Sequence, residues 1–303
     1  MSTFAPLMTA MATPMDPQGG LDVAGVQTLA THLADHGSGG LVVAGTTGES
    51  PTLTHDEMLT LYRTVVETVG DRAQVIAGVG KNDTAATIEL AKEATAAGVD
   101  GVMVVNPYYN KPSQRGLMAH FTAVAHATDL PVLLYNIPGR TSVETAPETL
   151  LRLAESVPNI AGVKDAVGDL EKTAWLAARK PDGFDIYSGD DANTLPMLAI
   201  GGAGLVSIAA HLVGDQLAEM ISVFERDPAR ARQIHLELLP LTTGLLSIDV
   251  NPVPLKAALN LAGLPGGPVR PPLADLDDAD LLALRDALAA AGVRTPSTNT
   301  ARN

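Results

Sequence analysis

The stretch QVIAGVGKNDTAATIELAKEATAAGVDGVMVVNPY, residues 74–108, contains a complete strand–helix–strand unit. Its short apolar runs at 74–80 and 101–108 are bounded by Gly, Pro or Asn, which is typical of buried strands. The segment between them has helical periodicity, starts with Asp83 and stops at Gly98. The stretch therefore predicts two parallel strands joined by a helix, because such a crossover returns the chain to the same edge of a sheet.

The same unit recurs along the chain. Another helical stretch, 54–69, starts with the capping-box pair Thr54 and Glu57. Eight units favour closure into an α/β fold, the (β/α)8 TIM barrel, although an open doubly wound sheet has the same alternation. The eight predicted strands span residues 7–15, 40–46, 74–80, 101–108, 131–138, 160–166, 185–190 and 204–210.

The alternation stops near Asp227, and the sequence beyond it is helical with frequent prolines. We therefore predict a catalytic barrel at 1–228 and a C-terminal helical domain at 229–293. The last residues, 294–303, have almost no apolar content, so we expect a disordered tail there.

The composition excludes several classes of function. The net charge of −14 disfavours binding to the phosphate backbone of a nucleic acid, so no nucleic-acid partner is expected. The chain has no Cys, which rules out disulfides, thiolate nucleophiles and cysteine metal sites. No apolar run approaches the roughly 20 residues that cross a bilayer, and the N-terminus lacks the features of a signal peptide. We therefore expect a cytoplasmic protein with no membrane partner.

Polar residues collect where predicted strands end. Chemistry in a TIM barrel lies at the C-terminal ends of the strands, so residues there that a core does not need are candidates for a site. Five strand ends carry such residues: GTTGES at 45–50, NPYYN at 106–110, YNIPGRT at 135–141, KD at 164–165 and SGDD at 188–191.

Lys164 is the candidate nucleophile. Strand alternation places it on the same face as Ile160 and Gly162. If this face lines the barrel, burial lowers the pKa of the amine and supplies the neutral form that attacks a ketone to make a Schiff base. Alternatively, Lys164 is a strand-end cation paired to Asp165 or Asp190, and the residue alone does not decide between the two.

Three hydroxyl groups are candidates for proton transfer. Tyr135, Tyr109 and Thr47 could pass protons between a Schiff base and water. For either tyrosine, a ring in the barrel mouth with its hydroxyl bonded to backbone explains the sequence equally well.

Two segments could bind carboxylates. Thr46, Thr47 and Gly48 resemble an anion cradle, although a simple turn has the same composition. Arg140 could hold a second carboxylate through two hydrogen bonds, or form a surface ion pair.

No metal site is expected. His32 and His36 stand four residues apart, but the sequence offers no third ligand, so we interpret them as part of a solvated helix face. The glycines at 201–204 precede a strand instead of following one, so they do not form a dinucleotide-binding loop.

The strand-end motifs also carry a family resemblance. GTTGES from Gly45, PYYNKPSQRGL from Pro107, YNIPGRT from Tyr135, GVKD from Gly162 and SGDD from Ser188 occur in the order and spacing of one family. The chain resembles the dihydrodipicolinate synthase and N-acetylneuraminate lyase superfamily over about residues 5 to 275.

The resemblance implies a role for each motif. It makes Lys164 the Schiff-base lysine, Tyr135 its proton donor and acceptor, and Thr47 a member of the relay. Tyr109 would complete that relay from the adjacent subunit. Residues implied to bind the substrates or shape their pocket are Thr46, Thr47, Arg140, Val206, Gly189 and Asp190.

Within the superfamily, the Gly139-Arg140-Thr141 motif and the segment 251–256 resemble the synthases. The implied reaction condenses pyruvate with L-aspartate-4-semialdehyde to 4-hydroxy-tetrahydrodipicolinate, in the route to diaminopimelate and lysine. The resemblance implies no cofactor, and a homotetramer of tight dimers. The alternatives are a pyruvate-lysine aldolase or dehydratase of sugar acids (neuraminate or 2-keto-3-deoxy acid type), and a silent barrel that senses a keto acid.

One departure concerns regulation. In lysine-inhibited members a histidine and a glutamate contact the inhibitor, and the corresponding positions here are Met58 and Ala86. Losing a carboxylate partner and a polar contact weakens the binding of a cationic ligand. We therefore predict weak or absent feedback inhibition by lysine.

Overall fold

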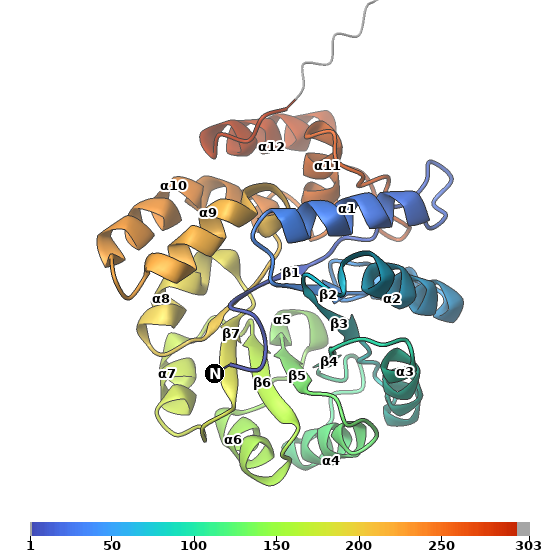
Figure 1. Cartoon of the computed structure of the whole chain (residues 1–303), viewed down its shortest axis with the longest axis vertical. Coiled ribbons are helices and arrows are strands. Elements are labelled where there is room, and N and C mark those ends of the chain that lie inside the picture. Colours follow the sequence, from blue (N-terminus) through green and yellow to red (C-terminus); the bar gives the residue numbers. More distant parts are fainter. Residues whose placement is uncertain (1, 296–303) are drawn as a thin grey trace, which may run out of the picture.

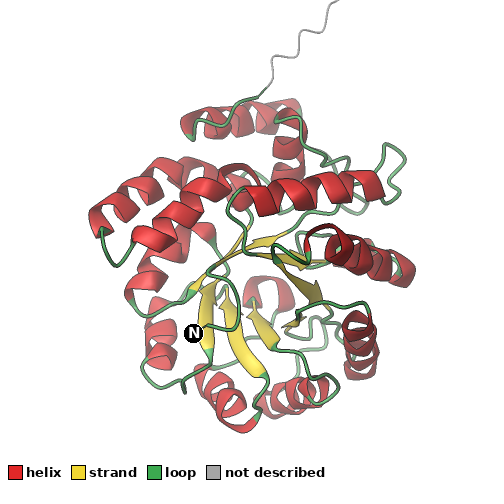
Figure 2. Cartoon of the chain, viewed as in Figure 1, coloured by secondary structure: helices red, strands yellow, loops and turns green. Residues whose placement is uncertain are grey.

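The computed structural model of the chain describes residues 2–295. Its eight strands are parallel, and each pairs with the next in chain order until the last pairs with the first (Figures 1 and 2). The predicted TIM barrel is confirmed, and the open doubly wound alternative is wrong. The strands are β1 (Leu7–Ala10), β2 (Gly40–Val43), β3 (Gln74–Gly78), β4 (Gly101–Val105), β5 (Val132–Asn136), β6 (Ile160–Asp165), β7 (Asp185–Ser188) and β8 (Gly204–Ser207).

Helices form the outer layer around these strands (Figure 2). In the first helix, Val26, Leu29, Ala30 and Leu33 recur at helical spacing and are all buried, so one face covers the barrel. The barrel helices are α1 (Val23–Asp35), η1 (Ser50–Thr52), α2 (His55–Val69), α3 (Thr84–Ala96), α4 (Gln114–Ala125), α5 (Pro138–Thr141), α6 (Pro147–Ser156), α7 (Leu170–Ala177), η2 (Asp191–Asn193), α8 (Thr194–Ala199) and α9 (Ala210–Val223).

The predicted helix ends are confirmed where the sequence carries capping chemistry. Thr54 and Glu57 form the reciprocal capping box at the start of α2. The Asp83 side chain accepts hydrogen bonds from two backbone N–H groups at the start of α3. After α3, Gly98 has a φ of 85°, a conformation that costs other residues strain.

Several strands are shorter than predicted. The first was expected to reach Met15 but ends at Ala10, and Met15 instead forms an isolated antiparallel bridge with Leu21. The fourth ends at Val105. Apolar runs indicate burial, and most of these residues are buried in loops beyond the last ladder pair, so composition alone overestimated the strands.

The C-terminal region is helical, as predicted. The Asp227 side chain caps the next helix by accepting from the Arg230 N–H. This region contains α10 (Pro228–Ser247), α11 (Val253–Leu261) and α12 (Asp278–Ala290). Figure 1 shows α10 beside α9 and α12 at the outer edge of the molecule.

The division into domains at residue 228 stays a prediction. The predicted tail, 294–303, lies mostly outside the described residues. Within residues 2–295, no helix combines the length and apolar content needed to cross a membrane.

Candidate active site

Lys164 and Tyr135 face each other at the C-terminal ends of neighbouring strands. They are register partners across β6 and β5. The Lys164 Nζ lies 4.3 Å from the centroid of the Tyr135 ring, and both side chains are buried, each 4% exposed. Strand alternation therefore points the Lys164 amine toward the Tyr135 ring, at the strand ends where the sequence predicted a site.

Burial lowers the pKa of Lys164 to about 8. The positive charge of Arg140 acts in the same direction, while the carboxylate of Asp191 opposes it. A substantial fraction of the amine is therefore neutral near pH 8, which is the form that attacks a carbonyl carbon.

The alternative that Lys164 is an ion-paired cation does not hold. Within residues 2–295, no carboxylate oxygen lies within ion-pair distance of its Nζ. The Asp165 carboxylate accepts instead from the Thr173 hydroxyl at 2.7 Å and the Val167 N–H at 3.0 Å. The Asp190 carboxylate accepts from Ala192 N–H and the Asn193 amide in its own loop.

Asp191 is a residue that the sequence interpretation missed. Its buried carboxylate accepts from the Ser207 hydroxyl and from the backbone N–H of Ile208 at 3.1 Å. Burial raises the pKa of Asp191. The residue stands beside the predicted Asp190 in the SGDD motif, so the signal was present, but only the fold shows which of the two is buried near Lys164.

Gly189 leaves room for the Lys164 side chain. A Cβ atom built at this position would lie 3.2 Å from the Lys164 Cε and 2.8 Å from the Ala166 Cβ. Any side chain here would displace the lysine or the neighbouring loop. This lack of space explains why a glycine stands at position 189 in the predicted pocket.

The Tyr135 phenol keeps its proton at neutral pH. Burial raises its pKa to about 12, although the charge of Arg140 and the nearby side chain of Thr46 both favour the ionised form. A phenol with this pKa suits brief proton transfer in a relay better than standing as a phenolate.

The turn after β2 is held in an unusual conformation. Ala44 and Glu49, at its two ends, have φ angles of 53° and 57°, which cost a non-glycine residue strain. In the part of the chain that the structure describes, the N–H groups of Thr47 and Gly48 donate to no protein acceptor. Free N–H groups beside two threonine hydroxyls can receive a carboxylate.

Asn251 connects two predicted site residues, although the sequence assigned it no role within the synthase-like segment 251–256. Its side-chain amide donates to the Thr47 hydroxyl at 2.9 Å. Its backbone carbonyl accepts from the Arg140 guanidinium at 2.9 Å. Because Asn251 is 204 residues from Thr47 in sequence, nothing local marks it as part of the site.

The loop that carries Arg140 is anchored by buried amides. Asn106, at the end of β4, donates to the Asn136 side chain and to the Val143 carbonyl at 2.9 and 3.0 Å. Asn136 in turn donates to the Thr145 carbonyl at 2.9 Å. Satisfied buried networks of this kind are rigid, so they fix the path of the chain on both sides of Arg140.

Tyr109 and Val206 are among the predicted site residues that make no described contact with Lys164. Tyr109 is 88% exposed, with a φ of 73°, and its side chain lies on the surface. Val206 is buried in β8. The structure of one chain therefore assembles Lys164, Tyr135 and the two threonines around the barrel mouth but leaves Tyr109 outside.

The histidine pair has structural contacts. The His32 Nε2 lies 3.1 Å from the His211 carbonyl, and the His36 Nδ1 pairs with Asp215 at 2.8 Å. No cluster of three or more His, Asp or Glu side chains suited to a metal occurs among the described residues.

Comparisons with known proteins agree on one family. The model of the Dihydrodipicolinate synthetase family matches residues 3–291. A 4-hydroxy-tetrahydrodipicolinate synthase from Symbiobacterium thermophilum is 52% identical over 294 residues, covering 97% of this chain and 100% of that protein. One from Acidothermus cellulolyticus is 53% identical over 290 residues, or 95% and 93% of the two chains.

A solved structure is similar to this chain as well, and it is from the same family. The crystal structure of DHDPS from Cyanidioschyzon merolae with lysine bound matches with a TM-score of 0.95 and 45% identity. The match covers 97% of this chain and 100% of that one.

Proposed function

The chain belongs to the dihydrodipicolinate synthetase family, and we propose that it is a lyase that condenses pyruvate with L-aspartate-4-semialdehyde. The product is 4-hydroxy-tetrahydrodipicolinate, which leads to diaminopimelate and lysine. The observation that carries the proposal is the buried amine of Lys164, which has no ion-pair partner among the described residues and lies against the Tyr135 ring. The names of the relatives favour this reaction over the sugar-acid alternatives. A cytoplasmic location stays a prediction.

Lys164 begins the chemistry. Its neutral amine adds to the pyruvate ketone, and loss of water gives an iminium ion. Loss of a methyl proton makes an enamine, whose carbon attacks the aldehyde of the second substrate. Transimination by the amine of that substrate then closes the ring and frees Lys164. The iminium nitrogen is the electron sink, so these steps require no metal or organic cofactor.

The turn after β2 binds the pyruvate carboxylate in this proposal. The free N–H groups of Thr47 and Gly48 and the hydroxyl of Thr46 are suitable donors for an anion. Gly189, Val206 and the Asp190 loop then form the surrounding wall.

Tyr135, Thr47 and Tyr109 form the proposed proton relay. The Asn251 amide already donates to the Thr47 oxygen, which leaves the hydroxyl proton of Thr47 free to be passed on. Tyr109 would enter the site of an adjacent subunit. Its 88% exposure on a strained turn supports this role, because a large ring held out into solvent gains from burial against a partner. We therefore propose a tight dimer as the active unit, within a homotetramer.

Arg140 binds the carboxylate of the semialdehyde in this proposal. It lies on α5 at the mouth of the barrel, and its guanidinium is held by only one described hydrogen bond, to the Asn251 carbonyl. The remaining N–H groups can form a bidentate pair with a carboxylate.

A coupled assay tests the proposal. Purified protein, pyruvate and L-aspartate-4-semialdehyde are combined with dihydrodipicolinate reductase, and NADPH oxidation is followed, with Lys164→Ala as the blank. Oxidation that disappears in the variant is expected. If borohydride traps pyruvate on Lys164 but no NADPH is consumed, the aldehyde substrate is a different one. If no pyruvate is trapped, the Schiff-base mechanism is wrong.

A further inference from the structure

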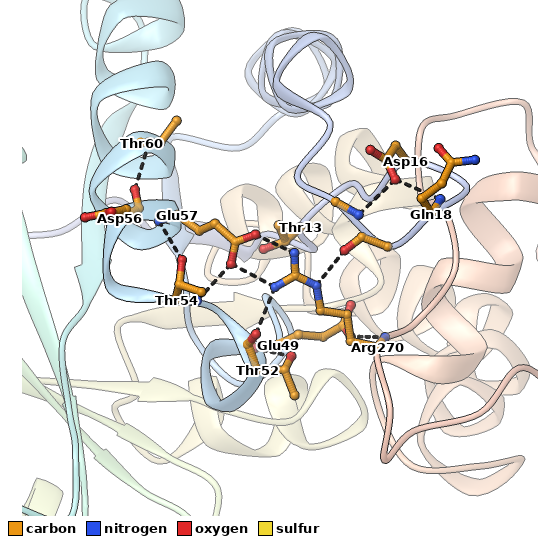
Figure 3. A network of polar contacts seen from close by, with 12 residues as sticks. Thr13, Asp16, Gln18, Glu49, Thr52, Thr54, Asp56, Glu57, Thr60 and Arg270 are labelled. Carbon is orange, nitrogen blue, oxygen red and sulfur yellow. Dashed lines mark hydrogen bonds and ion pairs between the residues drawn. The ribbon is translucent and has the colours of Figure 1, made fainter.

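A buried ion cluster joins the turn after β2 to the C-terminal region (Figure 3). The Glu49 carboxylate accepts from the Lys256 Nζ at 2.6 Å and from the backbone N–H of Arg270 at 2.8 Å. The side chains of Glu49 and Lys256 are each only 1% exposed. Glu49 directly follows the Thr46–Gly48 turn, so the cluster adjoins the proposed carboxylate site.

Lys256 also holds the opposite side of this turn. Its Nζ donates to the Thr13 carbonyl at 3.1 Å, and the Thr13 hydroxyl donates to the Gly48 carbonyl at 2.7 Å. Lys256 therefore connects to the turn both through Glu49 and through Thr13.

Arg270 completes the cluster. Figure 3 shows its guanidinium between Glu57 and the loop that carries Thr52. It donates two hydrogen bonds to the Glu57 carboxylate, one to the Thr52 carbonyl at 2.8 Å and one to the Gly19 carbonyl at 2.8 Å. Two carboxylates and two cations thus balance in charge, and every member has several partners.

Such a cluster is an inefficient way to stabilise a fold. Removing charges from water costs free energy that their attraction only partly recovers, and well-packed apolar side chains often serve stability equally well. Its members converge on Glu49, whose φ of 57° is strained and needs surrounding structure to persist. The cluster therefore serves to fix the backbone conformation at Glu49 more than to stabilise the fold.

We propose that Lys256 and Arg270 are positioning residues that hold Glu49, and through it the Thr46–Gly48 turn, in the shape that receives the substrate carboxylate. This inference rests on the proposed function. The three ties from the C-terminal region to the turn and Glu49 are Asn251 to Thr47, Lys256 to Glu49 and Arg270 to Glu49. The C-terminal region therefore completes a site whose proposed reacting groups all lie on the barrel.

Borohydride trapping of pyruvate tests the proposal directly, because it reports carboxylate binding and imine formation without the second substrate. The half-saturating pyruvate concentration and the saturating trapping rate are measured for wild type, Lys256→Met and Lys256→Arg. We expect half-saturation to rise about tenfold in Lys256→Met, a saturating rate within about twofold of wild type, and recovery in Lys256→Arg, which keeps the charge.

Arg230→Met is the matched control. Arg230 makes a two-bond ion pair with Glu219 between α10 and α9, at the surface and away from the turn. We expect its half-saturation to equal that of wild type. All variants are measured at a temperature at which circular dichroism shows them folded. If Lys256→Met does not fold, Glu49→Gln/Lys256→Met, which removes both charges together, takes its place with the same expectation.

Two outcomes would overturn the inference while leaving the proposed function intact. Unchanged half-saturation in a folded variant with a lowered Tm means that the cluster only stabilises the fold. A tenfold change in the Arg230→Met control as well means that the effect is not specific to the turn. Wild-type protein that traps no pyruvate refutes the proposed function itself, and the inference with it.

Discussion

Two lysines are buried in this molecule, and they differ in their partners. Lys164 is 4% exposed and lies against the Tyr135 ring without an ion-pair partner among the described residues. Lys256 is 1% exposed and donates to the Glu49 carboxylate at 2.6 Å. Burial lowers the pKa of both amines, but only Lys256 has a bonded carboxylate to oppose the shift. One site therefore favours a neutral amine, and the other pairs its amine with a carboxylate.

The two methionine variants should separate these roles. Lys164→Met removes the nucleophile, so we expect at least about a 10⁴-fold loss of condensation activity. We do not expect the Lys164→Met substitution to destabilise the fold. A pKa lowered from 10.5 to about 8 corresponds to roughly 3 kcal/mol. This contribution to stability is present above pH 10.5 and lost as the pH falls through about 8. At neutral pH the buried lysine therefore lowers the free energy of unfolding.

Chemical denaturation at pH 7 measures that cost. We expect the free energy of unfolding of Lys164→Met to equal or exceed that of wild type by up to about 3 kcal/mol. A variant that is clearly less stable than wild type would contradict the view that Lys164 is buried without an ion-pair partner.

Lys256→Met should have the opposite effect on stability. It leaves the Glu49 carboxylate buried without its cation, which typically costs about 3–5 kcal/mol. Urea titration of this variant beside Lys164→Met measures the difference. Equal stability of the two variants would remove the distinction between a catalytic and a structural lysine.

The pH dependence of imine trapping sharpens the comparison. With a Lys164 pKa of about 8, the neutral fraction rises about 50-fold between pH 6 and pH 8 and then levels off. Trapping of pyruvate at subsaturating concentration should follow this rise, with circular dichroism confirming an intact fold throughout. A midpoint near 10 would mean that the amine is solvated or ion-paired in the working enzyme.

Asn251→Ala tests the link between the C-terminal region and the proposed relay. The substitution removes the amide that donates to Thr47 but keeps the backbone carbonyl that holds Arg140. We expect pyruvate trapping to slow about tenfold while the KM for the semialdehyde changes less than twofold. Equal effects on both substrates would indicate a general disturbance of the loop, and Asn251→Asp, which keeps the shape, serves as the comparison.

The smallest effect is expected from added L-lysine. Met58 is buried and Ala86 is exposed, and the Nζ of Lys81 lies 3.7 Å from the Met58 sulfur. A fixed cation at Lys81 and the absence of a carboxylate at Ala86 both disfavour a cationic ligand. We expect less than a twofold loss of rate at millimolar lysine in the coupled assay, and a halved rate would refute this prediction.

Local sequence was sufficient for the barrel and for most of the candidate site. Strand–helix alternation predicted the closed sheet. The position at strand ends singled out Lys164 and Tyr135, because a hydrophobic core does not require an amine or a phenol there. The strand ends themselves were overestimated, as at Met15, because buried loops and buried strands share an apolar composition.

The residues that sequence reasoning missed are those whose role depends on distant partners. Asn251 and Lys256 begin and end the segment 251–256, which resembles the synthases, but nothing local connects them with a turn some 200 residues earlier. Asp191 was passed over for Asp190, although both are in the same motif.

The sequence by itself determined the barrel, the faces of its strands and the chemical groups at its mouth, since alternation and capping act between neighbours in the chain. Only the tertiary structure showed that the Lys256 amine donates to a carboxylate, whereas the Lys164 amine has no ion-pair partner among the described residues. Burial and charge pairing depend on segments that meet only in the folded molecule, so no local pattern records them.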